Sequence, residues 1–152
     1  MAKKAFFVIV LAFFLIFVYT GQNADDVPME EIEQQLKENT ELADMSRCGN
    51  RTLMQFYGLD YEQLDGYIYY KSGEALSVEE LLIVKTKDKS QLDSVKDAAE
   101  SRIQSQIKTY ESYGPKQVAM LENAIITVRG NYLFCCVADA PESYKEVFTD
   151  AI

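Results

Sequence analysis

The chain has 152 residues, of which 48% are hydrophobic, and this length and composition predict one ordinary folded domain. Its 24 acidic residues outnumber its 15 basic ones, and the net charge of −9 argues against nucleic acid as a partner. The chain has no histidine, which excludes Ser/His and Cys/His catalysis and histidine-based zinc sites.

The N-terminal residues are typical of a targeting segment. An uninterrupted apolar run, Ala5–Tyr19, follows Lys3 and Lys4 and gives way to a polar stretch. As a helix this run is about 22 Å long, which is shorter than the ~30 Å hydrocarbon core of a bilayer and favours a signal peptide. The sites before Gly21 and before Asp25 match a cleavage signal poorly, which favours an uncleaved membrane anchor. In both cases the rest of the chain is expected outside the cytoplasm.

The chain therefore divides into three parts. We expect a signal peptide or membrane anchor over residues 1–21, a linker over residues 22–27, and a single extracytoplasmic domain over residues 28–152. Pro28 is suited to the first turn of a helix, and this helix is predicted to end near Asn39.

The domain begins with short helices and continues with strands. A second helix is expected from Asn50 to Gly58, because glycine suits the left-handed position that ends a helix. Alternation of side chains predicts strands over residues 66–72 and 81–87.

Apolar residues at spacings of three and four then predict a long amphipathic helix from Ser90 to Tyr110. The segment 124–138 is predicted to form two strands joined by a tight turn at Gly130 and Asn131, and Pro141 opens a terminal helix. This order predicts an α+β fold with a mainly antiparallel four-stranded sheet. We expect the long helix and the C-terminal helix on one face, with the short helices N-terminal.

The three cysteines lack the spacing of a zinc or redox motif. Cys135 is expected to be buried as a small hydrophobic residue, since it shares an apolar strand face with Leu133 and Val137. A disulfide between Cys48 and Cys136 is left open. We predict no catalytic residues, no metal site and no cofactor.

The candidate binding residues are aromatic and cationic side chains on the second sheet face. If both helices cover the apolar face, the opposite face is predicted to gather Tyr67, Tyr69 and Lys71 with Arg129 and Tyr132. Tyrosine is favoured at interfaces because its ring is apolar and its hydroxyl is polar. The alternative is that the N-terminal helices fold across this face and bury the tyrosines in a second core.

Two stretches carry a resemblance to a known family: YGLDYEQLDGYIYYKSGEALSVEELLIVKTKD and LENAIITVRGNYLFCCVAD. With the helix between them, they resemble domain-of-unknown-function family 4358, small exported proteins of Gram-positive bacteria that are often lipoproteins. This chain has no cysteine before Cys48, so it lacks the lipid-attachment residue that such lipoproteins carry after the apolar segment. The resemblance implies no catalytic residues.

The sequence favours a non-catalytic, extracytoplasmic, membrane-associated domain that binds a protein or a cell-wall component. One alternative is an envelope enzyme that uses carboxylates or a metal. Another is a structural accessory subunit of a membrane complex. A secreted form, cleaved from its signal peptide, is the alternative to the anchored one.

Overall fold

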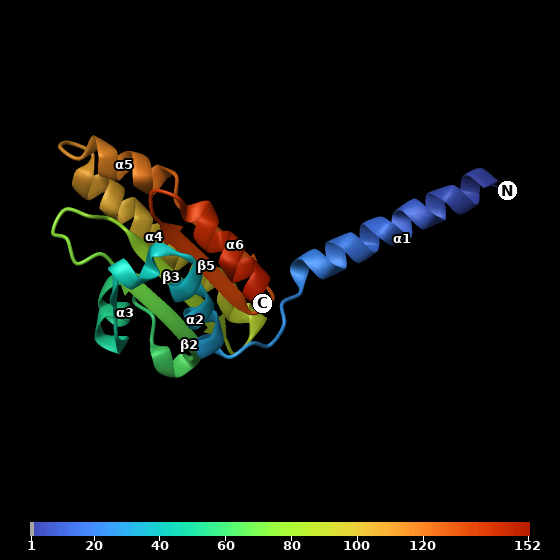
Figure 1. The fold of residues 1–152 in the computed structure, drawn as a ribbon, viewed down its shortest axis with the longest axis horizontal. Helices are drawn as coiled ribbons and strands as arrows, with labels where there is room; N and C mark the ends of the chain where they lie inside the picture. The colour runs from blue at the N-terminus through green and yellow to red at the C-terminus, as the bar shows by residue number, and fades with distance from the viewer. Residues whose placement is uncertain (1) are drawn as a thin grey trace.

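The computed structural model describes the backbone of residues 2–152 and the side chains of residues 5–19 and 23–152. Helix α1 (Ala2–Gln22) extends away from a folded domain formed by the rest of the chain (Figure 1). Lys3, Lys4 and the candidate cleavage position at Gly21 lie outside the described side chains. Among the helices formed by the described residues, none is both long enough and apolar enough to cross a membrane.

The domain contains five further α-helices and five strands among the described residues. The helices are α2 (Met29–Asn39), α3 (Asn50–Tyr57), α4 (Leu92–Tyr110), α5 (Pro115–Glu122) and α6 (Pro141–Ala151). The strands are β1 (Ser46–Arg47), β2 (Leu64–Lys71), β3 (Glu80–Thr86), β4 (Ile125–Arg129) and β5 (Tyr132–Val137). The predicted α+β class is confirmed.

The sheet is antiparallel throughout, with strand order β1-β2-β3-β5-β4. It has five strands, so the prediction of four was wrong. The additional strand is β1, in which Ser46 pairs with Lys71 and Arg47 with Tyr70. Two exposed polar residues carry no alternating pattern of apolar and polar side chains, which is why this strand could not be predicted.

Helices cover both faces of the sheet, so the chain forms three layers. Helices α3 and α4 contribute Leu53, Val95 and other residues to a core on one face. Helices α2 and α6 contribute Ile32, Phe148 and others to a separate core on the opposite face. The prediction that the long helix α4 and the C-terminal helix α6 share a face was therefore wrong.

Aromatic packing on β5 explains the position of α6. Phe148 stacks on Phe134 with ring centroids 5.1 Å apart and meets the edge of Tyr132 at 6.1 Å. All six residues of β5 are buried, so each of its faces needs a helical cover. The mixed polar and aromatic face predicted for this strand is in fact a second hydrophobic core.

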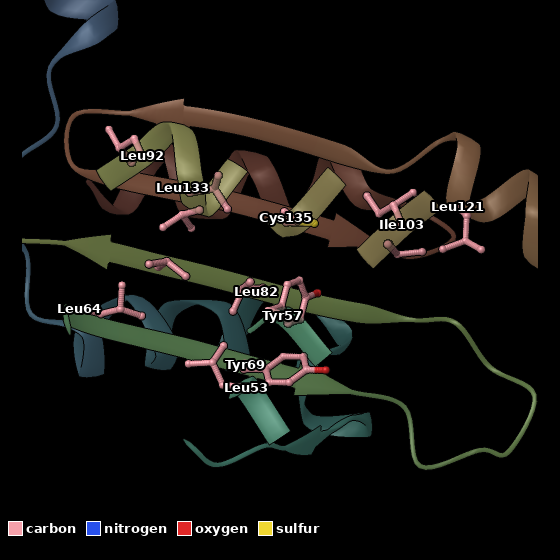
Figure 2. Packing of buried hydrophobic residues seen from close by; sticks show 14 of the residues in the cluster. Leu53, Tyr57, Leu64, Tyr69, Leu82, Leu92, Ile103, Leu121, Leu133 and Cys135 are labelled. Atoms are coloured by element: carbon pink, nitrogen blue, oxygen red, sulfur yellow. The ribbon is translucent and has the colours of Figure 1, made fainter. Parts of the chain in front are cut away.

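The core beneath α4 includes two of the tyrosines that cluster between residues 57 and 70. The rings of Tyr57 and Tyr69 meet edge to face at 5.3 Å, and both side chains are buried. Figure 2 shows their hydroxyls pointing the same way, toward the end of the sheet where β2 and β3 are joined. These tyrosines are core residues with polar tips.

Two glycines end or reverse elements by adopting positive φ, as predicted. Gly58 follows α3 with φ 65°, and Gly130 forms the tight turn between β4 and β5 with φ 58°. A left-handed backbone costs little at glycine because it has no Cβ. The local sequence is therefore sufficient to predict both of these glycine positions.

The buried position predicted for Cys135 is confirmed, with 2% of the residue exposed. All three cysteines are free thiols. Cys48 packs against the α4 face of the sheet, whereas Cys136 lies in the core on the opposite face, so the sheet separates these two residues. The Cys48–Cys136 disulfide left open by the sequence is not formed.

These positions predict which thiol reacts first. Burial raises the pKa of the Cys135 thiol to about 12, and it also raises the pKa of the Cys136 thiol. Cys48 is only partly buried, although burial raises the pKa of its thiol as well. In native protein at neutral pH, a maleimide should label Cys48 alone, and in denaturant it should label all three cysteines, as counted by mass spectrometry. A Cys48→Ser variant that still takes up label in the native state would contradict this packing.

Candidate functional site

A pocket of about 550 Å³ opens where β2 and β3 are joined. One wall comes from β1 and the end of β2, a second from the connection between β2 and β3, and a third from the second half of α4. The lining side chains used below are Cys48, Lys71, Glu74, Arg102 and Gln106. The pocket therefore draws its polar groups from three segments that are distant in the sequence.

Arg102, which lines the pocket, is paired with a buried carboxylate that has a matched set of donors. Glu80, the first residue of β3, is 2% exposed. Arg102 binds it in a bidentate manner, with Nε 3.1 Å from Oε2 and Nη2 3.3 Å from Oε1. The hydroxyl of Tyr69 donates a further hydrogen bond to Oε1. Burial and the neighbouring Glu80 charge raise the pKa of Tyr69 well above its usual range, so the hydroxyl stays protonated as a donor.

Arg102 is held in position by more than its ion pair. Its guanidinium carbon lies 4.3 Å from the centroid of the Phe56 ring, a cation–π contact with α3. The same ring has the Lys71 ammonium at 5.8 Å. Arg102 thus joins the sheet, α3 and α4, and Lys71 lies beside it at the rim of the pocket.

Two charged groups of the pocket have no ion-pair partner in the described part of the protein. Among the described side chains, neither Lys71 nor Glu74 forms a salt bridge. Nearby, burial raises the pKa of Cys48, although the Lys71 charge opposes this shift. Cys48 is accordingly a neutral thiol at neutral pH, which does not favour a nucleophilic role.

The structure separates the five binding residues predicted from the sequence. Tyr67, Tyr69 and Lys71 are on the α4 face, since Tyr69 pairs through Leu82 with Cys135. Tyr132 belongs to the α6 face, so the predicted single surface containing all five was wrong. Lys71 lines the pocket, whereas Tyr69 is a core residue whose hydroxyl bonds to Glu80. Tyr67 lies elsewhere on that face, where its hydroxyl donates to Asn50.

Arg129 and Tyr132 instead bind the chain's own linker. We call residues 23–27 the strap. Nε of Arg129 donates to the Asn23 carbonyl at 3.0 Å, and the hydroxyl of Tyr132 donates to the Val27 carbonyl at 3.0 Å. The predicted linker is therefore attached to the β4–β5 hairpin.

Close packing and an ion pair complete this attachment. A Cβ at Gly130 would come within 2.8 Å of the Cβ of Ala24, so glycine lets the strap approach the hairpin. Lys85 bonds to Asp26 in the strap and lies 3.3 Å from Asp65. Burial lowers the pKa of Lys85, but Asp26, Tyr132 and Asp65 together outweigh this effect and raise it.

Sequence reasoning missed Glu80, Arg102 and Gln106 as site residues. Arg102 falls on the polar face of the predicted amphipathic helix, yet only 14% of its side chain is exposed. One signal was present: Glu80 directly precedes an apolar strand, where a charge needs a partner if it is buried. The partner lies 22 residues away, and no local pattern identifies it.

The arrangement suits binding through charge and hydrogen bonds. Glu80 is already paired, so no second free carboxylate accompanies Glu74 at the pocket. Among the described residues, no three Cys, Asp or Glu side chains are grouped so that they could hold a metal ion.

The fold and the pocket define a small α+β domain in which helices cover both faces of an antiparallel sheet. Residues 38–138 match the family DUF4358, described as a domain of unknown function, and this match covers about two thirds of the chain. The chain therefore belongs to DUF4358, as its sequence motifs indicated. Every pocket residue lies within the matched region, whereas α1, the strap and α6 lie outside it. Neither the curated proteins nor the solved structures contain a match to this chain.

The buried ion pair predicts a large effect of one substitution. Arg102→Ala should lower the free energy of unfolding by about 3–5 kcal/mol, because it leaves the Glu80 carboxylate buried without a cation. Lys96→Ala is the matched control, since Lys96 pairs with Glu100 on the exposed face of the same helix and should change stability by less than about 0.5 kcal/mol. Urea unfolding of both variants measures the difference. Equal effects would contradict the role assigned to Arg102.

Proposed function

We propose that this protein is a non-catalytic, extracytoplasmic domain that associates with a membrane through α1 and binds a protein or cell-envelope partner at the pocket. The observation that carries the proposal is the placement of these two features. Helix α1 and the connection between β2 and β3 lie at opposite ends of the sheet (Figure 1), and this connection lines the pocket. A domain held at one end presents its other end to a partner.

The surface of α1 supports membrane association. Every residue from 5 to 19 is exposed, and aromatic side chains such as Phe6, Phe13 and Phe17 are at least 70% exposed. This stretch is apolar on all sides, so it has no polar face to turn toward water. A continuous exposed apolar surface of this kind marks a site of contact with a membrane or a protein.

The strap supports a fixed orientation of the domain relative to α1. Lys85, at the strap end of β3, and Glu80, at the pocket end, are five residues apart, or about 17 Å along an extended strand. Because Arg129, Tyr132 and Lys85 hold the strap, residues 23–27 are not a free tether. The pocket therefore points away from the attachment point of α1.

Two observations favour binding over the enzymatic alternative. The Glu80 carboxylate is neutralised by Arg102, so it is a structural group and not a free acid or base. The Cys48 thiol is protonated at neutral pH, because burial raises its pKa. The alternative of a structural accessory subunit differs from the proposed function only in that its partner is bound permanently. The secreted alternative requires a cut near Gly21 or Asp25.

One experiment tests location and binding together. A photocrosslinking residue replaces Lys71 or Thr109, which line the pocket, in the full chain expressed in cells. We expect the chain in the membrane fraction, with crosslinked adducts from both positions. Lys108 is the control, because it is exposed on α4 and does not line the pocket.

Three results would contradict the proposal in whole or in part. Equal adducts from all three positions would show that the pocket is not the binding surface. Recovery of the chain in the cytoplasm would contradict extracytoplasmic placement. A mature N-terminus at Gly21 or Asp25, with the chain in the medium, would replace the anchored form by the secreted one.

A further inference from the structure

The pocket has two opposite charges free for a ligand. Lys71 is the last residue of β2, and Glu74 belongs to the connection that follows this strand. Their side chains form no salt bridge with each other or with another described residue. The charge of Glu80 balances that of Arg102, and the charge of Glu74 balances that of Lys71. These four charges therefore sum to zero. A pocket of this balance does not favour a simple anion such as phosphate.

A buried acceptor adds a requirement for an N–H donor. The Oε1 atom of Gln106 is buried and has no hydrogen-bond partner among the described residues. Gln106 follows Arg102 by four residues on α4, so the two side chains lie on the same side of the helix. A buried polar atom without a partner is costly. Because Gln106 lines the pocket, a rotation of its side chain would present this oxygen to a donor from a ligand.

The connection between β2 and β3 is held in a defined shape. The backbone N–H of Glu74 donates to the Ser72 hydroxyl at 3.2 Å, and the Ser77 hydroxyl donates to Glu79 at 3.2 Å. Nε2 of Gln117, on α5, donates to the Leu76 carbonyl at 3.1 Å. These bonds fix the backbone of the connection beside α4, so Glu74 has a set place at the rim.

We propose that the pocket binds a short peptide with free termini. Lys71 pairs with the terminal carboxylate, Glu74 pairs with the terminal ammonium, and Gln106 Oε1 accepts a hydrogen bond from a peptide N–H. The volume of about 550 Å³ is in the range of small-molecule sites and exceeds the needs of a single ion. This inference rests on the proposed function, in which the pocket is the binding site, and it adds the class of ligand.

The test uses the full chain in detergent micelles and calorimetric titration with the dipeptide alanyl-glycine. Its N-acetylated form, its amidated form and inorganic phosphate are the comparison ligands. We expect the free dipeptide to bind, and the loss of either terminal charge to weaken binding about tenfold or more, as for a hydrogen-bonded charge pair. Phosphate should bind more weakly than the free dipeptide.

Three variants separate ligand contacts from folding. Lys71→Met and Gln106→Leu should each weaken dipeptide binding about tenfold, while Lys108→Met should not change it. Gln106→Leu should leave the melting temperature unchanged or raise it, because it removes a buried oxygen that has no partner. A loss of binding with a stable fold is thus the expected result for this variant.

The proposal is overturned if the dipeptide does not bind at about 10 mM, if the blocked forms bind as well as the free one, or if phosphate binds better. Unchanged binding in Lys71→Met and Gln106→Leu would also overturn it. Crosslinks from Lys71 and Thr109 that persist after such a result would leave the partner-binding function in place and remove only the peptide. Loss of both dipeptide binding and these crosslinks would contradict the proposed partner-binding function itself.

Discussion

Strand β3 is buried on both faces, and the rest of the structure depends on this constraint. Leu82 and Val84 face the core under α4, while Leu81 and Ile83 face the core under α2 and α6. A strand of this kind needs a helical layer on each side, although antiparallel sheets often leave one face to water. The three-layer arrangement follows from it.

The first residue of β3, Glu80, connects the burial of this strand to the pocket. Glu80 is the only charged residue among the described side chains that is buried, and its carboxylate needs donors inside the protein. Arg102 and Tyr69 supply them, and this brings α4 to the end of the sheet where the pocket opens. At the other end of β3, Lys85 helps to hold the strap. One strand thus places the pocket and the attachment of α1 at opposite ends.

Local sequence patterns predicted much of the fold. Contacts between residues distant in the sequence could not be predicted from these patterns. Gly58 and Gly130 were identified because positive φ favours glycine wherever the chain turns. The side of the sheet that α6 covers depends on Phe148 meeting Phe134, a choice that alternation along β5 does not decide when all its residues are buried. Lys71, a candidate because tyrosines and a lysine alternate along β2, lines the pocket. Arg102 was missed, since its partner lies across the fold.

The central claim is that the Glu80–Arg102 pair couples the sheet to α4 and holds Arg102 in the lining of the pocket. A double-mutant cycle with Glu80→Gln and Arg102→Met, measured by urea unfolding of the full chain in micelles, tests it most directly. The account predicts a coupling free energy of about 2–3 kcal/mol, because each single substitution leaves one partner buried and unmatched. Effects that add to within about 0.5 kcal/mol would contradict it.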